Sequence, residues 1–111
     1  MIEMGRPARA DDELDALFSA LADRTRRALL TRLARGPATI TELAEPFAMS
    51  LPAVSKHIRV LEEAGLLERS IDGRMHICAL NAEPLSEIEK WAREQRAFWD
   101  AKLERLARFV E

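Results

Sequence analysis

One segment, from Thr39 to Leu67, limits the possible folds more than any other part of the chain. Its apolar residues recur at helical spacing in two short runs, separated by Ala48-Met49-Ser50. Two short helices joined by so tight a turn form a helix-turn-helix, which presents its second helix to the major groove of DNA. We therefore expect a DNA-reading helix at the molecular surface.

The second helix of this pair is expected from about Leu51 to Ala64. Ser50 is a favourable N-cap, and Pro52 lies in the first turn, where its missing N–H leaves no hydrogen bond unmade. The buried stripe, at i, i+4 and i+7, consists of Val54, Ile58 and Leu61. Gly65 ends this helix, whose opposite side is polar and free to contact a ligand.

Three helices are expected before this DNA-reading helix. Asp11 or Asp12 caps the first, whose apolar stripe consists of Leu14, Leu17, Phe18 and Leu21. Asp23 caps the second, which is rich in arginine and ends at Gly36-Pro37. Thr39 or Thr41 starts the third, and Pro46 ends its regular hydrogen bonding.

A β-hairpin is expected directly after the helix-turn-helix. The segments LLERSI and RMHICAL flank Asp72-Gly73, a dipeptide that favours the tight turn between antiparallel strands. A hairpin in this position is the wing of a winged helix. The expected fold class is therefore mainly α with a small β-hairpin: a winged helix-turn-helix of about five helices and a two-stranded antiparallel wing.

A long final helix is expected over about residues 83–110, opened by Asn81 or Ser86. At about 1.5 Å per residue it is roughly 40 Å long, more than a small winged-helix body covers. Its apolar stripe carries both tryptophans and is either packed on its own core or paired across a two-fold homodimer, which we favour. The expected interface residues are Leu14, Leu17, Phe18, Leu21, Ile88, Trp91, Gln95, Phe98, Trp99, Lys102 and Leu106.

Length and composition indicate one soluble domain, expected over residues 11–111. Residues 1–10 are expected to be disordered, and they lack the apolar core of a secretory signal. The apolar runs are too short to span a bilayer, so we expect no membrane association. The single cysteine, Cys78, excludes an internal disulfide and fits a cytoplasmic location.

The net charge of −2 argues mildly against a nucleic-acid partner, but its distribution favours one. Residues 24–35 hold five arginines and no acid, which form either a phosphate-docking surface or a solvated helix face. On the second helix of the pair, Ser55, Lys56 and Arg59 lie opposite the buried stripe and can meet base edges or phosphates. The expected contacts with double-stranded DNA are Ser50, Leu51, Pro52, Ala53, Ser55, Lys56, His57, Arg59 and Arg74.

Two of these residues have a structural alternative. His57 flanks the buried stripe, so it either contacts DNA or packs at a helix junction. Arg74, at the wing turn, either enters the minor groove or meets a phosphate, or is merely solvated.

The order and spacing of these motifs resemble the ArsR-type winged-helix transcriptional regulators. The matching stretches are FSALADRTRRALLTRLARG, TELA, SLPAVSKHIRVLEEAGLL and the DGR turn, so the resemblance runs from about Leu14 to the C-terminus. It implies a homodimer, formed through the first and last helices, that binds an operator with two-fold pseudosymmetry. It also implies a repressor whose effector relieves repression.

The sequence departs from the metal-sensing members of that family. Where those members often carry a Cys-x-Cys pair, this chain has Thr39 and Thr41, and its last helix contains no histidine. Neither family metal site can form without thiolate or imidazole ligands, so we expect no metal and no cofactor. His76 and Cys78 alone are too few for a closed site, and a redox role for Cys78 is a weak hypothesis.

Two other functions compete with operator binding. A winged-helix protein-interaction module would dock a different protein through the aromatic last helix. An enzyme is not expected, because the chain has no nucleophile–base pair, phosphate loop or metal set. Within the dimer hypothesis, an unknown apolar small-molecule effector would bind between aromatic side chains and be oriented by Gln95, or else Gln95 and Lys102 simply edge the stripe.

Overall fold

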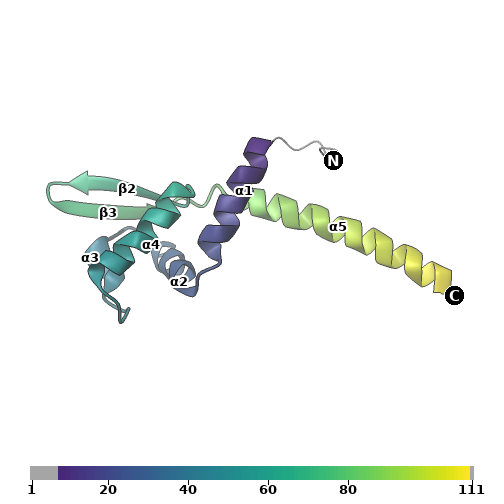
Figure 1. The fold of residues 1–111 in the computed structure, drawn as a ribbon, viewed down its shortest axis with the longest axis horizontal. Coiled ribbons are helices and arrows are strands. Elements are labelled where there is room, and N and C mark those ends of the chain that lie inside the picture. The colour runs from purple at the N-terminus through teal and green to yellow at the C-terminus, as the bar shows by residue number, and fades with distance from the viewer. Residues whose placement is uncertain (1–7, 111) are drawn as a thin grey trace.

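The computed structural model describes residues 8–110, and its elements follow the order of a winged helix-turn-helix (Figure 1). They are α1 Ala8–Leu21, α2 Arg24–Leu33, β1 Ala38–Thr39, α3 Ile40–Ala44, α4 Leu51–Glu63, β2 Leu67–Asp72, β3 Met75–Leu80 and α5 Leu85–Val110. The first four helices gather into a body from which the β2–β3 hairpin projects at one end and α5 at the other (Figure 1). The predicted winged-helix fold is confirmed.

Three helices start at the caps that the sequence predicts. The Asp23 carboxylate accepts a hydrogen bond from the backbone N–H of Arg26 at 3.0 Å. Thr39 and Glu42 form a reciprocal capping box, with bonds of 3.1 and 2.8 Å. The Ser50 hydroxyl accepts from the backbone N–H at the third position of α4 at 3.3 Å. Local side-chain chemistry therefore explains where α2, α3 and α4 begin.

The first residues predicted for α1 and α5 need correction. Residues 8–10, expected to be disordered, belong to α1, and residues 1–7 of that prediction lie outside the described residues. Alanine favours the helix, and Asp11 in the first turn complements the helix dipole, so α1 extends beyond the expected cap. The last helix begins at Leu85, whereas the Asn81 side chain bonds the carbonyl of Gly65 and the backbone N–H of Glu83 in the preceding loop.

The sheet has three strands rather than the two predicted. The short strand β1 pairs antiparallel with β3, with Ala38 opposite Cys78 and Thr39 opposite Ile77, so the strand order is β1-β3-β2. Two residues are too few to show the alternation by which a strand is recognised in a sequence. The added strand ties the linker between α2 and α3 to the base of the wing.

The wing turn lies one residue later than predicted. Asp72 pairs with Met75 as the last rung of the hairpin, and the loop consists of Gly73 and Arg74. Gly73 has φ 64°, and no residue other than glycine has a positive φ in the described chain. A positive φ at the first loop position alone is the pattern of a type II′ turn, so Gly73 rather than Asp72-Gly73 as a pair determines the turn.

One core joins every element of the body. It consists of Leu17, Ala20, Leu29, Leu33, Ala38, Leu43, Val54, Ile58, Leu61, Leu66, Leu67 and Cys78. α5 contributes no buried residue, and only its first turns, at Leu85 and Ile88, pack against this core. Most of α5 therefore projects from the body (Figure 1), and its large apolar side chains beyond Ile88 are exposed.

The predicted interface residues of α1 differ in accessibility. Leu14 and Leu17 are buried within a single chain because α1 packs on α2 and α4, and Leu21 is half-buried against the same core. Phe18 remains 39% exposed and lies edge-on to Trp91 of α5, with ring centroids 5.3 Å apart. Of this group, Phe18 is the side chain with substantial free surface.

Candidate nucleic-acid interface

The outer side of α4 is a polar ridge held by an apolar anchor. Val54, Ile58 and Leu61 have no exposed surface, so the helix is fixed against the core along one side. At 100° per residue, the exposed residues of the opposite side fall in one line: Pro52, Lys56, Arg59 and Glu63. This ridge presents two cationic side chains and one carboxylate outward.

The N-terminal end of α4 adds smaller groups to this ridge. Ser50, Leu51 and Pro52 are exposed, whereas Ala53 and Ser55 are half-buried. Ser50 is engaged as the N-cap, but a hydroxyl can accept one bond and still donate another. Seven of the predicted contact residues therefore lie at one end or on one side of α4. They are Ser50, Leu51, Pro52, Ala53, Ser55, Lys56 and Arg59.

The wing adds a third exposed cation to Lys56 and Arg59, and two exposed apolar side chains that the sequence interpretation did not include. Arg74 is exposed in the hairpin loop, next to Met75, and Ile71 lies 66% exposed near the end of β2. Both apolar side chains are exposed because the hairpin extends past the body, as Figure 1 shows, where no other element covers it.

His57 lies at a helix junction, as its structural alternative predicts. Its Nδ1 is 3.1 Å from a guanidinium nitrogen of Arg26 and 3.9 Å from a carboxylate oxygen of Asp23. The side chain is 22% exposed. The structure thus turns this histidine toward the start of α2 and away from the ridge that carries Lys56 and Arg59.

Of the five arginines in residues 24–35, Arg26, Arg27 and Arg32 hydrogen-bond backbone carbonyls, whereas Arg24 and Arg35 are exposed. Arg26 donates to the carbonyls of Ala20 at 2.7 Å and Ser19 at 3.0 Å, and Arg27 donates to that of Leu21 at 2.8 Å. Arg32 bonds the carbonyl of Gly36 at 3.2 Å. The carbonyls of Ser19, Ala20 and Leu21 belong to the last turn of α1, and Gly36 follows the end of α2. The sequence does contain a signal for these hydrogen bonds: the connection between α1 and α2 is short, and α2 begins with several arginines.

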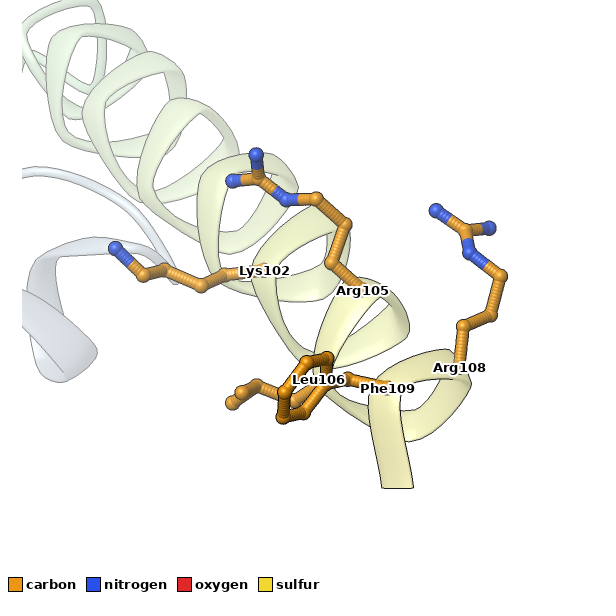
Figure 2. A pocket seen from close by; sticks show the side chains of 5 residues that line it. All are labelled: Lys102, Arg105, Leu106, Arg108 and Phe109. Atoms are coloured by element: carbon orange, nitrogen blue, oxygen red, sulfur yellow. The ribbon is translucent and has the colours of Figure 1, made fainter. Parts of the chain in front are cut away.

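α5 carries an exposed aromatic and aliphatic stripe. Phe98 and Trp99 contact one another edge-on with centroids 5.8 Å apart, and the Lys102 ammonium lies 5.4 Å from the Phe98 ring centroid. Further along, an open hollow is lined by Lys102, Arg105, Leu106, Arg108 and Phe109. In Figure 2 the Leu106 and Phe109 side chains lie on one side of the helix, and Arg105 and Arg108 extend away from them. Gln95 is also exposed.

Comparison with known proteins identifies the family. Residues 21–70 match the family described as "Helix-turn-helix domain". The HTH-type transcriptional regulator Rv2034 of Mycobacterium tuberculosis is 35% identical over 87% of this chain and 88% of its own length. A crystal structure of an ArsR family transcriptional regulator superposes with a TM-score of 0.78 at 48% identity, covering 81% of this chain and 93% of the other. The chain belongs to the ArsR family.

A further relative of this ArsR family protein is the transcriptional repressor SdpR of Bacillus subtilis. It is 31% identical over 70% of this chain and 87% of its own length. The ArsR family consists of DNA-binding transcriptional regulators, and this chain is one of them. Its helix-turn-helix, formed by α3 and α4, and its β2–β3 wing are the parts that define the fold.

The positions of the family metal sites serve other roles in this ArsR family protein. Thr39 caps α3, and Thr41 is exposed on the same helix. Over residues 8–110 no cluster of three or more His, Cys, Asp or Glu side chains is arranged to hold a metal ion. The same residues include no helix long and apolar enough to cross a membrane.

Cys78 and His76 do not form a reactive pair. The thiol is fully buried, and burial raises its pKa above the ordinary value, only partly opposed by the charge of Arg69. Arg69 instead bonds the Glu62 carboxylate at 3.1 Å and lies 3.5 Å from Nδ1 of the exposed His76. Because the thiolate is the reactive form, this environment disfavours the redox hypothesis for Cys78.

Proposed function

We propose that this ArsR family protein is a repressor that binds a two-fold pseudosymmetric operator as a homodimer without a metal cofactor. The observation that carries the proposal is the form of α4. Its apolar side is completely buried, and its opposite side presents Lys56 and Arg59 to solvent. A helix anchored in this way can enter a major groove as a rigid element, with its polar ridge toward the bases.

The proposed contacts divide by chemistry. Lys56 and Arg59 can bind guanine or phosphate, and Ser55 can hydrogen-bond several base edges. Apolar surface for a thymine methyl group is offered by Leu51, Pro52 and Ala53. The Ser50 hydroxyl can bind a phosphate. Arg74 in the wing loop would meet phosphate or enter the minor groove. His57, held by Arg26, is the weakest candidate for direct contact.

The exposed stripe of α5 supports self-association. Trp99 is 56% exposed and Phe109 88% exposed, and large apolar side chains of this kind recur along the helix. A contiguous apolar surface of this length needs a partner, and a second copy of the same helix supplies a matching stripe through two-fold symmetry. The proposed interface is centred on Phe18, Trp91, Phe98, Trp99, Lys102 and Leu106, with Gln95 at its edge.

The names of two relatives support repression as the direction of regulation. SdpR is named a transcriptional repressor, and Rv2034 a transcriptional regulator. A protein that binds an operator through α4 and the wing represses when the operator overlaps the promoter. Relief of repression by an apolar effector at the dimer interface belongs to the same proposal.

Binding to the DNA immediately upstream of its own gene tests this function. Fluorescence anisotropy at several salt concentrations should show saturable binding whose affinity falls steeply with salt, because phosphate contacts release counterions. Added metal ions should not change the affinity. Sedimentation should find a dimer in the same buffer. Absence of salt-sensitive binding would overturn the proposal, and a stable monomer would favour a protein-interaction module with a free α5.

A further inference from the structure

Arg26 occupies the point at which α1, α2 and α4 meet. Its guanidinium donates to the carbonyls of Ser19 and Ala20, in the last turn of α1, and to Nδ1 of His57 on α4. Its own backbone N–H donates to the Asp23 cap of α2. One residue therefore joins three helices through four hydrogen bonds of 2.7–3.1 Å.

The chemistry of these bonds fixes their direction. A guanidinium has donors and no acceptor, so Nδ1 of His57 accepts this hydrogen bond. The planar guanidinium therefore donates to three acceptors that lie in different directions: the carbonyls of Ser19 and Ala20, and Nδ1 of His57. A lysine ammonium is a point charge at the end of a flexible stem and cannot reproduce this arrangement.

The two ends of this connection lie beside the two proposed functional surfaces. Ser19 follows Phe18, whose ring packs against Trp91 of α5. On α4, His57 is the immediate neighbour of Lys56, which lies on the exposed ridge. A bond from His57 to α2 resists rotation of α4 about its own axis, and such rotation would move the ridge residues across the groove.

We propose that Arg26 is a positioning residue that couples the dimer-forming helices to the recognition helix. The inference rests on the proposed function, because it assumes that α4 reads DNA and that α1 and α5 pair with a second copy. Arg26 sets the rotation of α4 relative to the end of α1, so that the two recognition helices of a dimer present their ridges in matching orientation. His57 then acts on operator affinity through Arg26 rather than by touching DNA.

The central test is a double-mutant cycle on operator affinity. His57→Phe keeps an aromatic ring but removes the acceptor, and Arg26→Lys keeps the charge but removes the fork. Each should weaken operator binding about tenfold, the effect of losing one charge-assisted hydrogen bond. The double variant should be no weaker than either single variant, because both changes break the same connection. His57→Asn, which offers an acceptor near the position of Nδ1, should recover most of the affinity.

A matched control separates positioning from general stability. Arg27→Ala removes a bond to the same end of α1 but makes no bond to α4 in the structure. It should lower the thermal midpoint while leaving operator affinity within about twofold of the parent, since the lost bond does not connect α1 to α4. All variants should remain dimers, and the salt dependence of His57→Phe should match the parent because no phosphate contact is lost.

The outcomes separate this inference from the function on which it rests. If the parent binds its upstream DNA and His57→Phe binds equally well, the coupling is wrong and the proposed function stands. Additive losses in the double variant would show that His57 acts independently of Arg26, and would also overturn the coupling. If the parent shows no salt-sensitive binding, the proposed function is overturned and the inference with it. If Arg26→Lys fails to fold, the two His57 variants alone decide the result.

Discussion

Lys56 and Arg59 stand on the exposed ridge of α4, one turn apart, and have no ion-pair partner among the contacts found in the described chain. Replacing either with alanine should weaken operator binding by about 1–3 kcal/mol where a base contact is lost. Where a phosphate contact is lost instead, the slope of the logarithm of the binding constant against the logarithm of the salt concentration should decrease in magnitude by about 1. Anisotropy titrations at several salt concentrations measure both quantities.

Glu63 provides the control for these two variants. It lies on the same ridge near the C-terminal end of α4, beyond the part of the helix expected to enter the groove. Glu63→Ala should not weaken binding, because a carboxylate near DNA is repelled by phosphate. An equal loss of affinity in all three variants would mean that the ridge does not face the DNA.

Asp23 gives the protein a pH-dependent element of stability. The hydrogen bond from the Arg26 backbone N–H, together with the charge of Arg26, lowers the pKa of this carboxyl below 3.8 despite some opposing desolvation. A pKa lower in the folded state means that ionised Asp23 stabilises the fold above pH 3.8, and that this contribution is lost as the pH falls through the folded-state pKa.

Asp23→Asn isolates this effect, since asparagine also caps helices but does not titrate. Near neutral pH the parent should have the higher thermal midpoint, and the difference should shrink once the pH falls below about 3.8. Circular dichroism melts across this range measure it. A difference that grows in acid would contradict the assignment of Asp23 as a stabilising carboxylate.

At the scale of elements, the wing depends on the backbone of one residue. Gly73 has φ 64°, and open space surrounds the position where a side chain would begin. Gly73→Ala should therefore destabilise the protein by about 1 kcal/mol through backbone strain rather than steric clash. Gly73→Asn should cost less, because asparagine tolerates the left-handed region. Urea denaturation compares the variants, and equal losses would indicate that contacts of the new side chain matter more than φ.

Local interactions determine where three helices begin, whereas a tertiary contact determines the third strand. α2, α3 and α4 begin at caps that are formed by neighbouring residues, so their starts follow from the sequence. The third strand, β1, exists because the linker after α2 lies beside β3, a relation between segments nearly forty residues apart. An element of two residues has no pattern of its own to reveal it.

At the scale of the whole molecule, the proposed homodimer depends on the free stripe of α5. Trp99→Glu places a carboxylate in the centre of the proposed interface and should convert the dimer to a monomer, because a buried unpaired charge costs several kcal/mol. Operator affinity should fall with it, since each monomer then reaches only one half-site. Sedimentation and anisotropy measure the two effects.

Ala97→Glu is the matched control on the other side of α5. It adds the same charge at an exposed position that lies away from the stripe at 100° per residue. This variant should remain a dimer and bind as the parent does. If Trp99→Glu also remains a dimer with full affinity, the second copy must pair through another surface.

The order of helices and hairpin, the buried stripe of α4 and the outward position of Lys56 and Arg59 were all predictable from the sequence. These features depend on periodicity and on caps that lie within a few residues, so local chemistry determines them. The resemblance in motif order led to the ArsR family for the same reason, because motif spacing is a property of the chain itself.

Only the tertiary structure decided the partners of the charged side chains. The sequence allowed His57 to face DNA and the α2 arginines to face solvent, but the fold brings Arg26 to both His57 and the end of α1. It likewise exposes the apolar side chains of Ile71 and Met75 on the projecting hairpin. A side chain bonds whatever lies within a few ångströms, and that neighbourhood depends on how distant segments pack rather than on their spacing along the chain.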